Sequence, residues 1–363
     1  MKIITILGAR PQFIKAAAVS YVLKQEEQIE EVLVHTGQHF DSNMSEVFFQ
    51  QLGIPEPKYN LAIHGGGHGQ MTGRMLEAIE EVLVKEEPNM VMVYGDTNST
   101  IAGALAAKKL HIPLAHVEAG LRSFNIKMPE EINRILTDRV SDLLFCPTQT
   151  AIDNLGKEGF DNFEAQVLLT GDVMYDAVKL FKSLVEQQNV PLPEAVEPNK
   201  YLLLTLHRAE NTDDPQRLSR LIEVLNKIHE NQVEILCPLH PRTRKKLEEY
   251  DLQPRFHTVA PVGYLEMVQL LKNCQLVLTD SGGLQKEAYF FHKPCVTLRD
   301  ETEWVELVEH GYNTIAGADA AIIEKAVGEG LNHQLSFGEN LYGDGNAAIL
   351  IRDAMLEFSS NPK

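Results

Sequence analysis

Carboxylates follow two apolar runs of the sequence, at the points where each run is predicted to end as a β-strand. The runs end at Tyr94 and Val117, and the acids close behind them are Asp96, Glu118, Glu130 and Glu131. Open α/β sheets bind ligands at the carboxyl ends of their strands, so we expect these acids at one crevice. The nearby histidines lack the spacing of zinc ligands. Singly, each acid could cap a helix, but together they favour acid–base catalysis on an organic substrate.

A third apolar run, at 276–279, continues into Asp280-Ser281-Gly282-Gly283. Two glycines at the start of a helix leave its free N–H groups open to an anion, which predicts a phosphate cradle. Glu287 follows about one and a half turns later, where a carboxylate could bind the two hydroxyls of a ribose. An ordinary serine-capped helix is the alternative interpretation.

Basic residues gather at other predicted strand ends. Pro11 suits the first turn of a helix that presents Arg10 and Lys15, although Lys15 alone could be a solvated surface residue. Together these groups could supply a local positive field for an anionic small molecule. The set is Arg10, Lys15, His207, Arg208, His240 and Arg242.

The composition excludes several classes of function. A formal net charge of −18 argues against a nucleic acid or an anionic membrane as partner. Neither a Gly-x-Gly-x-x-Gly turn directly after a strand nor a Gly-x-x-x-x-Gly-Lys-Ser/Thr loop occurs, so we expect no bound nicotinamide and no nucleotide triphosphatase. The four cysteines are far apart in apolar segments and are predicted to be buried free thiols. The first strand is too short for a signal sequence, so we expect a cytoplasmic protein.

Apolar strands alternate with helical periodicity almost throughout the 363 residues, which is typical of parallel sheets covered by helices. The pattern predicts two doubly wound Rossmann-like domains, at 1–171 and 172–346, and a last helix within 347–363 that packs back on the first domain. Strands are expected at 3–7, 32–35, 90–94, 114–117, 143–146, 167–170, 201–206, 233–237, 276–279 and 296–298. Helices are expected at 11–24, 71–85, 99–110, 130–140 and 347–358.

The sequence resembles the non-hydrolysing UDP-N-acetylglucosamine 2-epimerases, and the likeness runs nearly from end to end. The resemblance implies the glycosyltransferase-B fold, with two Rossmann-like domains facing each other across a cleft. It also implies a homodimer that needs no cofactor and no metal. The motifs that carry it are Gly8-Ala9-Arg10-Pro11 with Lys15, Gly95-Asp96-Thr97, His116-Val117-Glu118-Ala119-Gly120-Leu121-Arg122, Pro129-Glu130-Glu131 with Asn133-Arg134, His207-Arg208, Asp280-Ser281-Gly282-Gly283 with Glu287, Lys293-Pro294, Arg299-Asp300 and Tyr342-Gly343-Asp344-Gly345.

The resemblance also implies roles for individual residues. The catalytic set is Asp96, Glu118, Glu130 and His207, and Glu130 is preferred over Glu131 because it directly follows Pro129. UDP contacts are predicted from Arg10, Lys15, His207, Arg208, His240, Ser281, Gly282, Gly283 and Glu287. The implied reaction interconverts UDP-GlcNAc and UDP-ManNAc by anti-elimination of UDP, through a 2-acetamidoglucal, followed by re-addition. It would supply precursors for cell-surface polysaccharide.

One region departs from the best-known branch of that family, whose members bind a second UDP-GlcNAc as an activator. Only Gln38 and His39 keep the expected residue types there, whereas Phe40, Asp41 and the glycines at 65–67 do not. The segments at 41–45 and 299–304 look more like a branch that includes UDP-2,3-diacetamido-2,3-dideoxy-glucuronate 2-epimerases. That sugar nucleotide is therefore a second candidate substrate. The sequence also leaves open a retaining glycosyltransferase, a hydrolysing epimerase and a non-catalytic UDP-sugar sensor.

Overall fold

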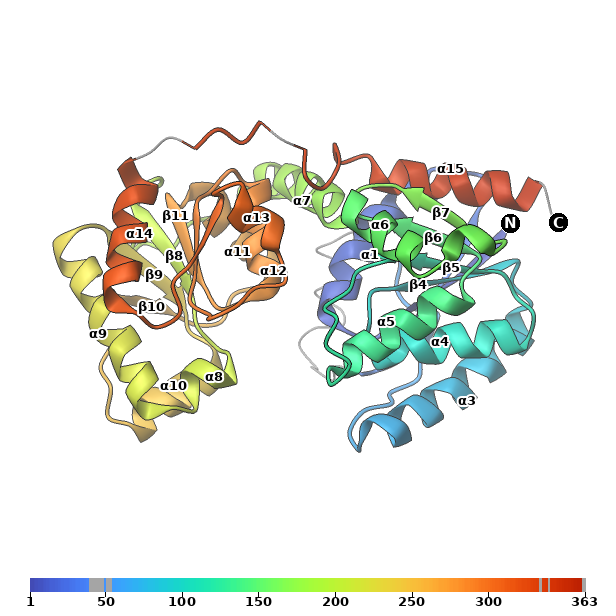
Figure 1. Cartoon of the computed structure of the whole chain (residues 1–363), viewed down its shortest axis with the longest axis horizontal. Helices are drawn as coiled ribbons and strands as arrows, with labels where there is room; N and C mark the ends of the chain where they lie inside the picture. Colours follow the sequence, from blue (N-terminus) through green and yellow to red (C-terminus); the bar gives the residue numbers. More distant parts are fainter. Residues whose placement is uncertain (39–48, 50–53, 333–334, 339, 361–363) are drawn as a thin grey trace. The chain divides into compact units, whose positions relative to one another are not determined.

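The first unit of the chain is built on a seven-stranded parallel sheet in the order β3-β2-β1-β4-β5-β6-β7 (Figure 1). The computed structural model describes residues 1–38, 49, 54–332, 335–338 and 340–360. Every residue of β4 is buried, as expected for a central strand that is covered on both faces. The strands are β1 (Lys2–Leu7), β2 (Glu30–His35), β3 (Tyr59–Asn60), β4 (Met90–Tyr94), β5 (Leu114–Val117), β6 (Leu143–Cys146) and β7 (Gln166–Leu169).

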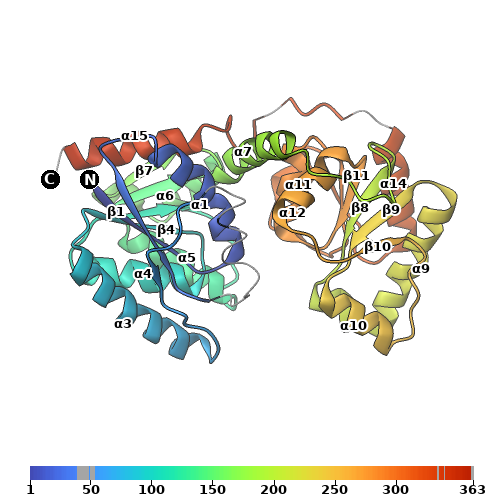
Figure 2. The same cartoon turned by 180° about the vertical axis from the view of Figure 1, so that it is seen from behind.

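Helices cover both faces of this sheet. Buried side chains of α3 and α4 form one apolar core with the central strands, while α1 packs against α15 on the opposite side (Figures 1 and 2). The Thr97 side chain caps α4 by accepting a hydrogen bond from the Thr100 amide. The helices are α1 (Arg10–Leu23), α3 (His68–Glu86), α4 (Asn98–Lys109), α5 (Pro129–Val140), α6 (Gln149–Lys157), the 3₁₀ turn η1 (Phe160–Asn162) and α15 (Ala347–Ser360). A further helix, α7 (Val173–Gln188), begins in this unit and ends in the second.

The second unit repeats the plan with a six-stranded parallel sheet in the order β10-β9-β8-β11-β12-β13. Its strands are β8 (Tyr201–Thr205), β9 (Glu234–Pro238), β10 (His257–Val259), β11 (Leu276–Thr279), β12 (Cys295–Thr297) and β13 (Asn313–Ile315). One apolar core includes α9 and α14, and a second includes α11 and α12. The helices are α8 (Ala209–Thr212), α9 (Pro215–Asn231), α10 (Pro241–Glu249), α11 (Tyr264–Asn273), α12 (Gly282–Phe290), α13 (Val305–Glu309) and α14 (Ala320–Asn332).

The boundaries between the units differ from those that the sequence predicts. One unit comprises Met1–Lys179 with Asn340–Lys363, and the other comprises Leu180–Glu339. The first boundary thus lies eight residues later than predicted (179 against 171), and the second lies seven earlier (339 against 346). The reason is that the start of α7 and the residue before it bind the start of α15 and the segment before it. The Asp172 amide donates to the Tyr342 carbonyl at 2.9 Å, and the Asp176 carboxylate accepts from the Ala348 amide at 3.0 Å.

The four cysteines are free and buried, which confirms their predicted state. None of the helices in the described part of the chain combines the length and the apolar character needed to cross a membrane.

Candidate active site

Two of the predicted acids lie at the carboxyl ends of neighbouring strands in the first unit. β4 and β5 pair with Tyr94 opposite Val117, and Asp96 and Glu118 follow directly beyond these ends. A carboxylate oxygen of Glu118 lies 3.3 Å from the position that a Cβ atom would take on Gly95. The structure therefore brings the two acids together at one edge of the sheet.

Glu118 is held in an uncommon backbone conformation. Its φ angle is +72°, in the left-handed region that residues other than glycine rarely adopt. The amides of Glu118 and Ala119 both donate to the Phe145 carbonyl at 3.1 Å, which fixes the turn. The Lys15 ammonium, predicted to contact UDP, pairs with the Glu118 carboxylate. Strain that the surroundings hold in place is typical of functional positions.

Asp96 also pairs with a cation. Its carboxylate lies 2.6 Å from a terminal nitrogen of Arg134, and its carbonyl accepts from the Asn133 side chain at 2.8 Å. Burial raises the pKa of the Asp96 carboxyl, and this effect outweighs the nearby Arg134 charge. The sequence assignment omits Arg134, although its position four residues after Glu130 on one helix is a signal for it.

Glu130 and Glu131 have different surroundings in the first turn of α5. Glu131 is buried and accepts hydrogen bonds from the Ser123 amide, the Ser123 hydroxyl and the Phe124 amide, each at 2.9 Å. Burial would raise the pKa of Glu131, but these bonds and Arg134 outweigh it and lower the pKa. Glu130 is only partly buried. Glu131 thus holds the preceding loop, which supports the choice of Glu130 for the sugar.

The other charged residues of the His116–Arg122 motif form a scaffold under the acids. The His116 ring is fully buried, with Nδ1 2.7 Å from an Asp138 oxygen and Nε2 2.8 Å from the Gly95 carbonyl. The second Asp138 oxygen accepts from Arg122 at 2.7 Å and from the Gly120 amide at 3.1 Å. Gly120 has φ +78°, and a Cβ atom there would meet the Ala151 carbonyl. This network fixes the turn that carries Glu118.

The start of α1 is fixed in a similar way. The Gln12 side chain accepts hydrogen bonds from the Gly8 amide at 2.8 Å and the Ala9 amide at 2.9 Å. Pro11 occupies the first turn, as predicted from its fixed φ angle. Arg10 begins the helix and is partly exposed, so its guanidinium can reach an anion.

In the second unit, Asp280 organises the turn that follows β8. This buried carboxylate accepts from the His207 and Arg208 amides, both at 2.9 Å, and lies 3.0 Å from His207 Nδ1. Burial would raise the pKa of Asp280, but the hydrogen bonds from His207 and Arg208 lower it. Asp280 therefore orients His207, a role that the sequence assignment did not give it.

The predicted phosphate cradle lies at the start of α12. Ser281 is the N-cap residue, and its amide donates to the Thr279 hydroxyl at 2.9 Å. No described atom lies within 4 Å of a Cβ position on Gly283, so this turn is open there. Glu287 is buried, and its carboxylate accepts from the Tyr264 hydroxyl at 2.8 Å. These placements are compatible with the predicted diphosphate and ribose contacts.

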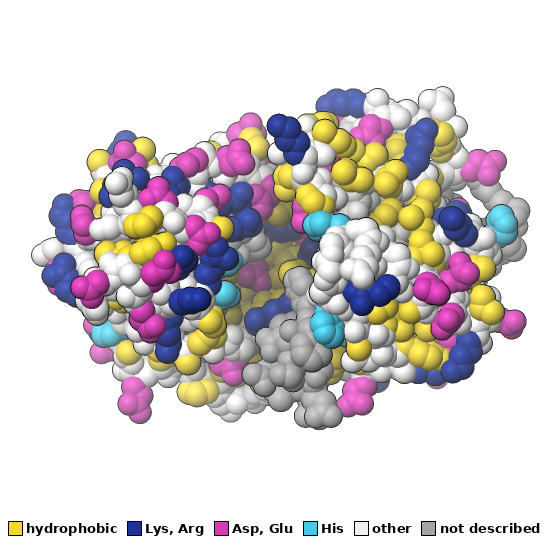
Figure 3. All heavy atoms as spheres, turned by 90° about the horizontal axis from the view of Figure 1, so that it is seen from below, with side chains coloured by type: hydrophobic (Ala, Val, Ile, Leu, Met, Phe, Trp, Pro, Cys, Tyr) yellow, Lys and Arg dark blue, Asp and Glu magenta, His cyan; other side chains and the backbone are white. Residues whose placement is uncertain are grey.

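Two residues of the predicted basic set, Arg242 and His240, bind neighbours in the second unit. Arg242 pairs with Asp213 at 2.5 Å. Burial lowers the pKa of His240, and the neighbouring His207 and Arg242 lower it further. His240 Nδ1 instead accepts from the Arg242 amide at 3.2 Å and caps α10. Figure 3 shows Lys and Arg side chains interspersed with Asp and Glu over the face that it draws.

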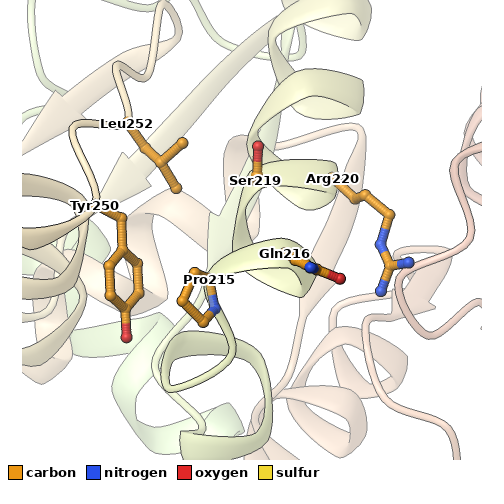
Figure 4. A pocket seen from close by; sticks show the side chains of 6 residues that line it. All are labelled: Pro215, Gln216, Ser219, Arg220, Tyr250 and Leu252. Carbon is orange, nitrogen blue, oxygen red and sulfur yellow. The ribbon is translucent and has the colours of Figure 1, made fainter.

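A hollow on the second unit lies apart from these residues. It is formed by the start of α9 and the chain after α10, and Figure 4 shows the side chains around it. None of the predicted site residues lines it. The lining residues are Pro215, Gln216, Ser219, Arg220, Tyr250 and Leu252.

Comparison with known proteins decides the family. The family model described as UDP-N-acetylglucosamine 2-epimerase matches residues 22–356. The chain belongs to this family. The UDP-2,3-diacetamido-2,3-dideoxy-D-glucuronate 2-epimerase of Pseudomonas aeruginosa is 57% identical, over 97% of this chain and 99% of that protein. The UDP-N-acetylglucosamine 2-epimerase of Methanocaldococcus jannaschii is 44% identical over 96% of both chains.

Solved structures of UDP-N-acetylglucosamine 2-epimerases share the fold. The Methanocaldococcus jannaschii enzyme in complex with UDP-GlcNAc and UDP has a TM-score of 0.85 and 43% identity, covering 98% of this chain and 100% of that one. The Neisseria meningitidis enzyme bound to UDP-GlcNAc has a TM-score of 0.86 and 30% identity, with the same coverage. These likenesses and the two parallel sheets confirm the predicted α/β fold of the glycosyltransferase-B type.

Proposed function

We propose that the chain is a non-hydrolysing epimerase that inverts C2 of a UDP-linked 2-acetamido sugar. The observation that carries the proposal is the pair of acids at one sheet edge, each beside its own cation: Asp96 with Arg134 and Glu118 with Lys15. A carboxylate that is kept ionised beside a cation is able to accept a proton and to return it. Proton transfer at C2 needs groups of this kind.

The chemistry requires UDP to leave before the C2 proton. No carbonyl neighbours C2, so a base alone cannot remove that proton. When the C1–O bond breaks, UDP takes the electron pair and the positive charge that develops at C1 acidifies C2–H. A carboxylate then accepts the proton and a C1=C2 double bond forms. Protonation of C2 on the other face and return of the UDP oxygen to C1 complete the inversion.

The proposal divides this work between two groups of residues. Asp96, Glu118 and Glu130 stabilise the charge at C1 and move the proton. His207, Arg208, His240, Arg10, Lys15 and the turn at 281–283 hold UDP, and Glu287 binds the ribose. Hydrogen-bond donors and cations aimed at a departing diphosphate lower the barrier to its departure. In this scheme His207 also assists the departure of the diphosphate, a role that the family resemblance implies.

We infer that UDP-2,3-diacetamido-2,3-dideoxy-glucuronate is the preferred substrate. The support is the 57% identity to the epimerase of that sugar, against 44% for the UDP-N-acetylglucosamine 2-epimerase of M. jannaschii. The cations beside Asp96 and Glu118 would also reduce the repulsion that a sugar carboxylate meets. UDP-GlcNAc is the second candidate, because several relatives carry its name.

Steady-state assays on both nucleotide sugars test the substrate. We expect kcat/KM for the diacetamido-glucuronate to exceed that for UDP-GlcNAc by at least about tenfold, since groups that bind the extra substituents are left unpaired by the simpler sugar. A larger kcat/KM with UDP-GlcNAc would assign the chain to the UDP-GlcNAc/UDP-ManNAc reaction.

The pH dependence of kcat should report the protonation of the Asp96 carboxylate. If its ionised form accepts the C2 proton, activity is lost as the pH falls through its raised pKa. The acidic limb of the pH–rate profile should therefore lie above the usual aspartate pKa of about 3.9. Arg134→Gln removes the cation that opposes this rise and should move the limb to higher pH. Arg134→Lys keeps the charge and should move it less. A limb that stays in place in Arg134→Gln would contradict the role of Asp96.

Activation by a second UDP-sugar is not expected in this chain. Gln38 is occupied, because its side-chain oxygen accepts from the Ser99 amide at 3.0 Å and the Ser99 hydroxyl at 2.7 Å. His39, Phe40 and Asp41 lie outside the described residues. Gly65 and Gly67 offer no side chains to a ligand. Rates should therefore follow a hyperbola in substrate, and the reverse reaction should start without a lag. A Hill coefficient clearly above one would show that other residues form an activator site.

The cytoplasmic location, the homodimer and the role in polysaccharide synthesis stay predictions from the sequence and its resemblance.

A further inference from the structure

An acidic side chain lies against the turn of α12 that is proposed to hold the diphosphate. A Cβ atom on Gly282 would collide with the Oε1 atom of Glu303. The other oxygen of this carboxylate accepts from the Arg299 Nη1 atom at 2.9 Å. One carboxylate thus accepts a hydrogen bond from an arginine and lies against the first residue of the helix. A phosphate group in the proposed site would make contacts of the same kind.

The neighbours of Glu303 fix it in this place. The Trp304 indole N–H donates to the Gly282 carbonyl at 2.8 Å, and the Thr302 hydroxyl donates to the Gln285 side chain at 2.6 Å. The Lys286 ammonium lies 4.2 Å from the centre of the Trp304 ring. Residues on both sides of Glu303 are therefore attached to α12, while the Glu303 side chain itself is 41% exposed and able to turn away.

Arg299 has unused capacity to bind an anion. It follows β12, which pairs directly with β11, so its backbone lies at the sheet edge from which α12 begins. Its side chain is only 11% exposed. The Nε atom is buried and makes no hydrogen bond within the described part of the chain, and Oε1 of Glu210 is 3.6 Å away from it. A buried guanidinium with a spare donor favours a ligand with several acceptor oxygens.

We propose that Glu303 occupies the diphosphate site of the nucleotide-free enzyme, and that the diphosphate of UDP displaces it and takes Arg299 as a further ligand. This inference rests on the proposed function, because it takes α12 as the UDP site. Arg299 is already buried at the site, so little side-chain entropy is lost when the anions exchange. Glu303 then sets the affinity for UDP by competing with it.

Two glutamate variants test the competition. Glu303→Gln removes the competing charge and keeps the shape of the side chain. Glu301→Gln is the matched control, because it makes the same charge change two residues away on an exposed side chain. Calorimetric titration with UDP and with uridine measures each variant. Uridine lacks phosphates, so its affinity reports any change that does not involve the diphosphate.

Glu303→Gln should bind UDP about two- to fivefold more tightly, the range expected when a partly exposed ion pair no longer has to be broken. Its affinity for uridine, and both affinities of Glu301→Gln, should match those of the unaltered chain. Arg299→Lys should weaken UDP and leave uridine unchanged, because an ammonium lacks the planar fork of donors.

Unchanged or weaker UDP binding by Glu303→Gln would overturn the inference, and so would an equal gain for uridine. In either case, UDP binding by the unaltered chain would still support the proposed function. If the unaltered chain binds no UDP, the proposed function and this inference fail together.

Discussion

Replacement of Glu130 by glutamine should lower kcat by about 10²-fold or more and leave the affinity for UDP within a few-fold. The amide keeps the size of the side chain but neither accepts a proton nor stabilises positive charge at C1. Asp96→Asn and Glu118→Gln should behave alike, because each removes one of the carboxylates proposed to act on the sugar. Steady-state kinetics and UDP titrations of the three variants provide the measurement.

The adjacent residue offers a matched control. Glu131→Gln changes the same chemical group one position away, but Glu131 accepts three hydrogen bonds from Ser123 and Phe124. This variant should lose thermal stability, whereas Glu130→Gln should keep its melting temperature. If Glu130→Gln retained full kcat while Glu131→Gln lost activity without loss of stability, the assignment of the two acids would be reversed.

Replacement of Asp138 by leucine should lower the free energy of unfolding by about 3–5 kcal/mol, the range found when one partner of a buried ion pair is removed. Asp138 is fully buried and accepts from Arg122 and the Gly120 amide, with His116 Nδ1 at 2.7 Å. All three partners would lose the hydrogen bond to Asp138. Chemical denaturation of the variant and the unaltered chain measures the loss.

Glu158 is the control for this prediction, because it binds the same arginine from the surface. Arg122 Nε donates to it at 2.7 Å, and the Glu158 side chain is 33% exposed. Glu158→Gln should therefore cost no more than about 1 kcal/mol. Equal losses in Asp138→Leu and Glu158→Gln would show that the buried network does not hold this turn.

Central strands of both sheets follow from the sequence, and so does the edge strand β7, whereas the other three edge strands do not. β4 and β11 are buried on both faces and so read as unbroken apolar runs. The sequence prediction misses β3, β10 and β13, which lie at sheet edges and have only two or three residues each. Their pairing is set by the neighbouring strand, so their own residues carry little signal.

The positions of Asp96 and Glu118 beyond strand ends could be predicted from the sequence, but the pairing of Glu118 with Lys15 could not. Lys15 and Glu118 are 103 residues apart in the chain, and only the fold brings them together. The sequence motif also groups residues with different tasks. His116 and Arg122 stand beside Glu118 in the motif, yet their side chains are buried under it as a scaffold.

Isotope exchange at C2 tests the central claim most directly. The purified chain is incubated with a UDP-linked 2-acetamido sugar in deuterium oxide, and the products are examined by NMR spectroscopy and mass spectrometry. Parallel incubations with UDP-2,3-diacetamido-2,3-dideoxy-glucuronate and UDP-GlcNAc cover both candidate substrates. The proposed reaction predicts two C2 epimers, both still attached to UDP and both carrying deuterium at C2. Release of a free sugar, transfer of the sugar to an acceptor, or epimers without deuterium at C2 would contradict it.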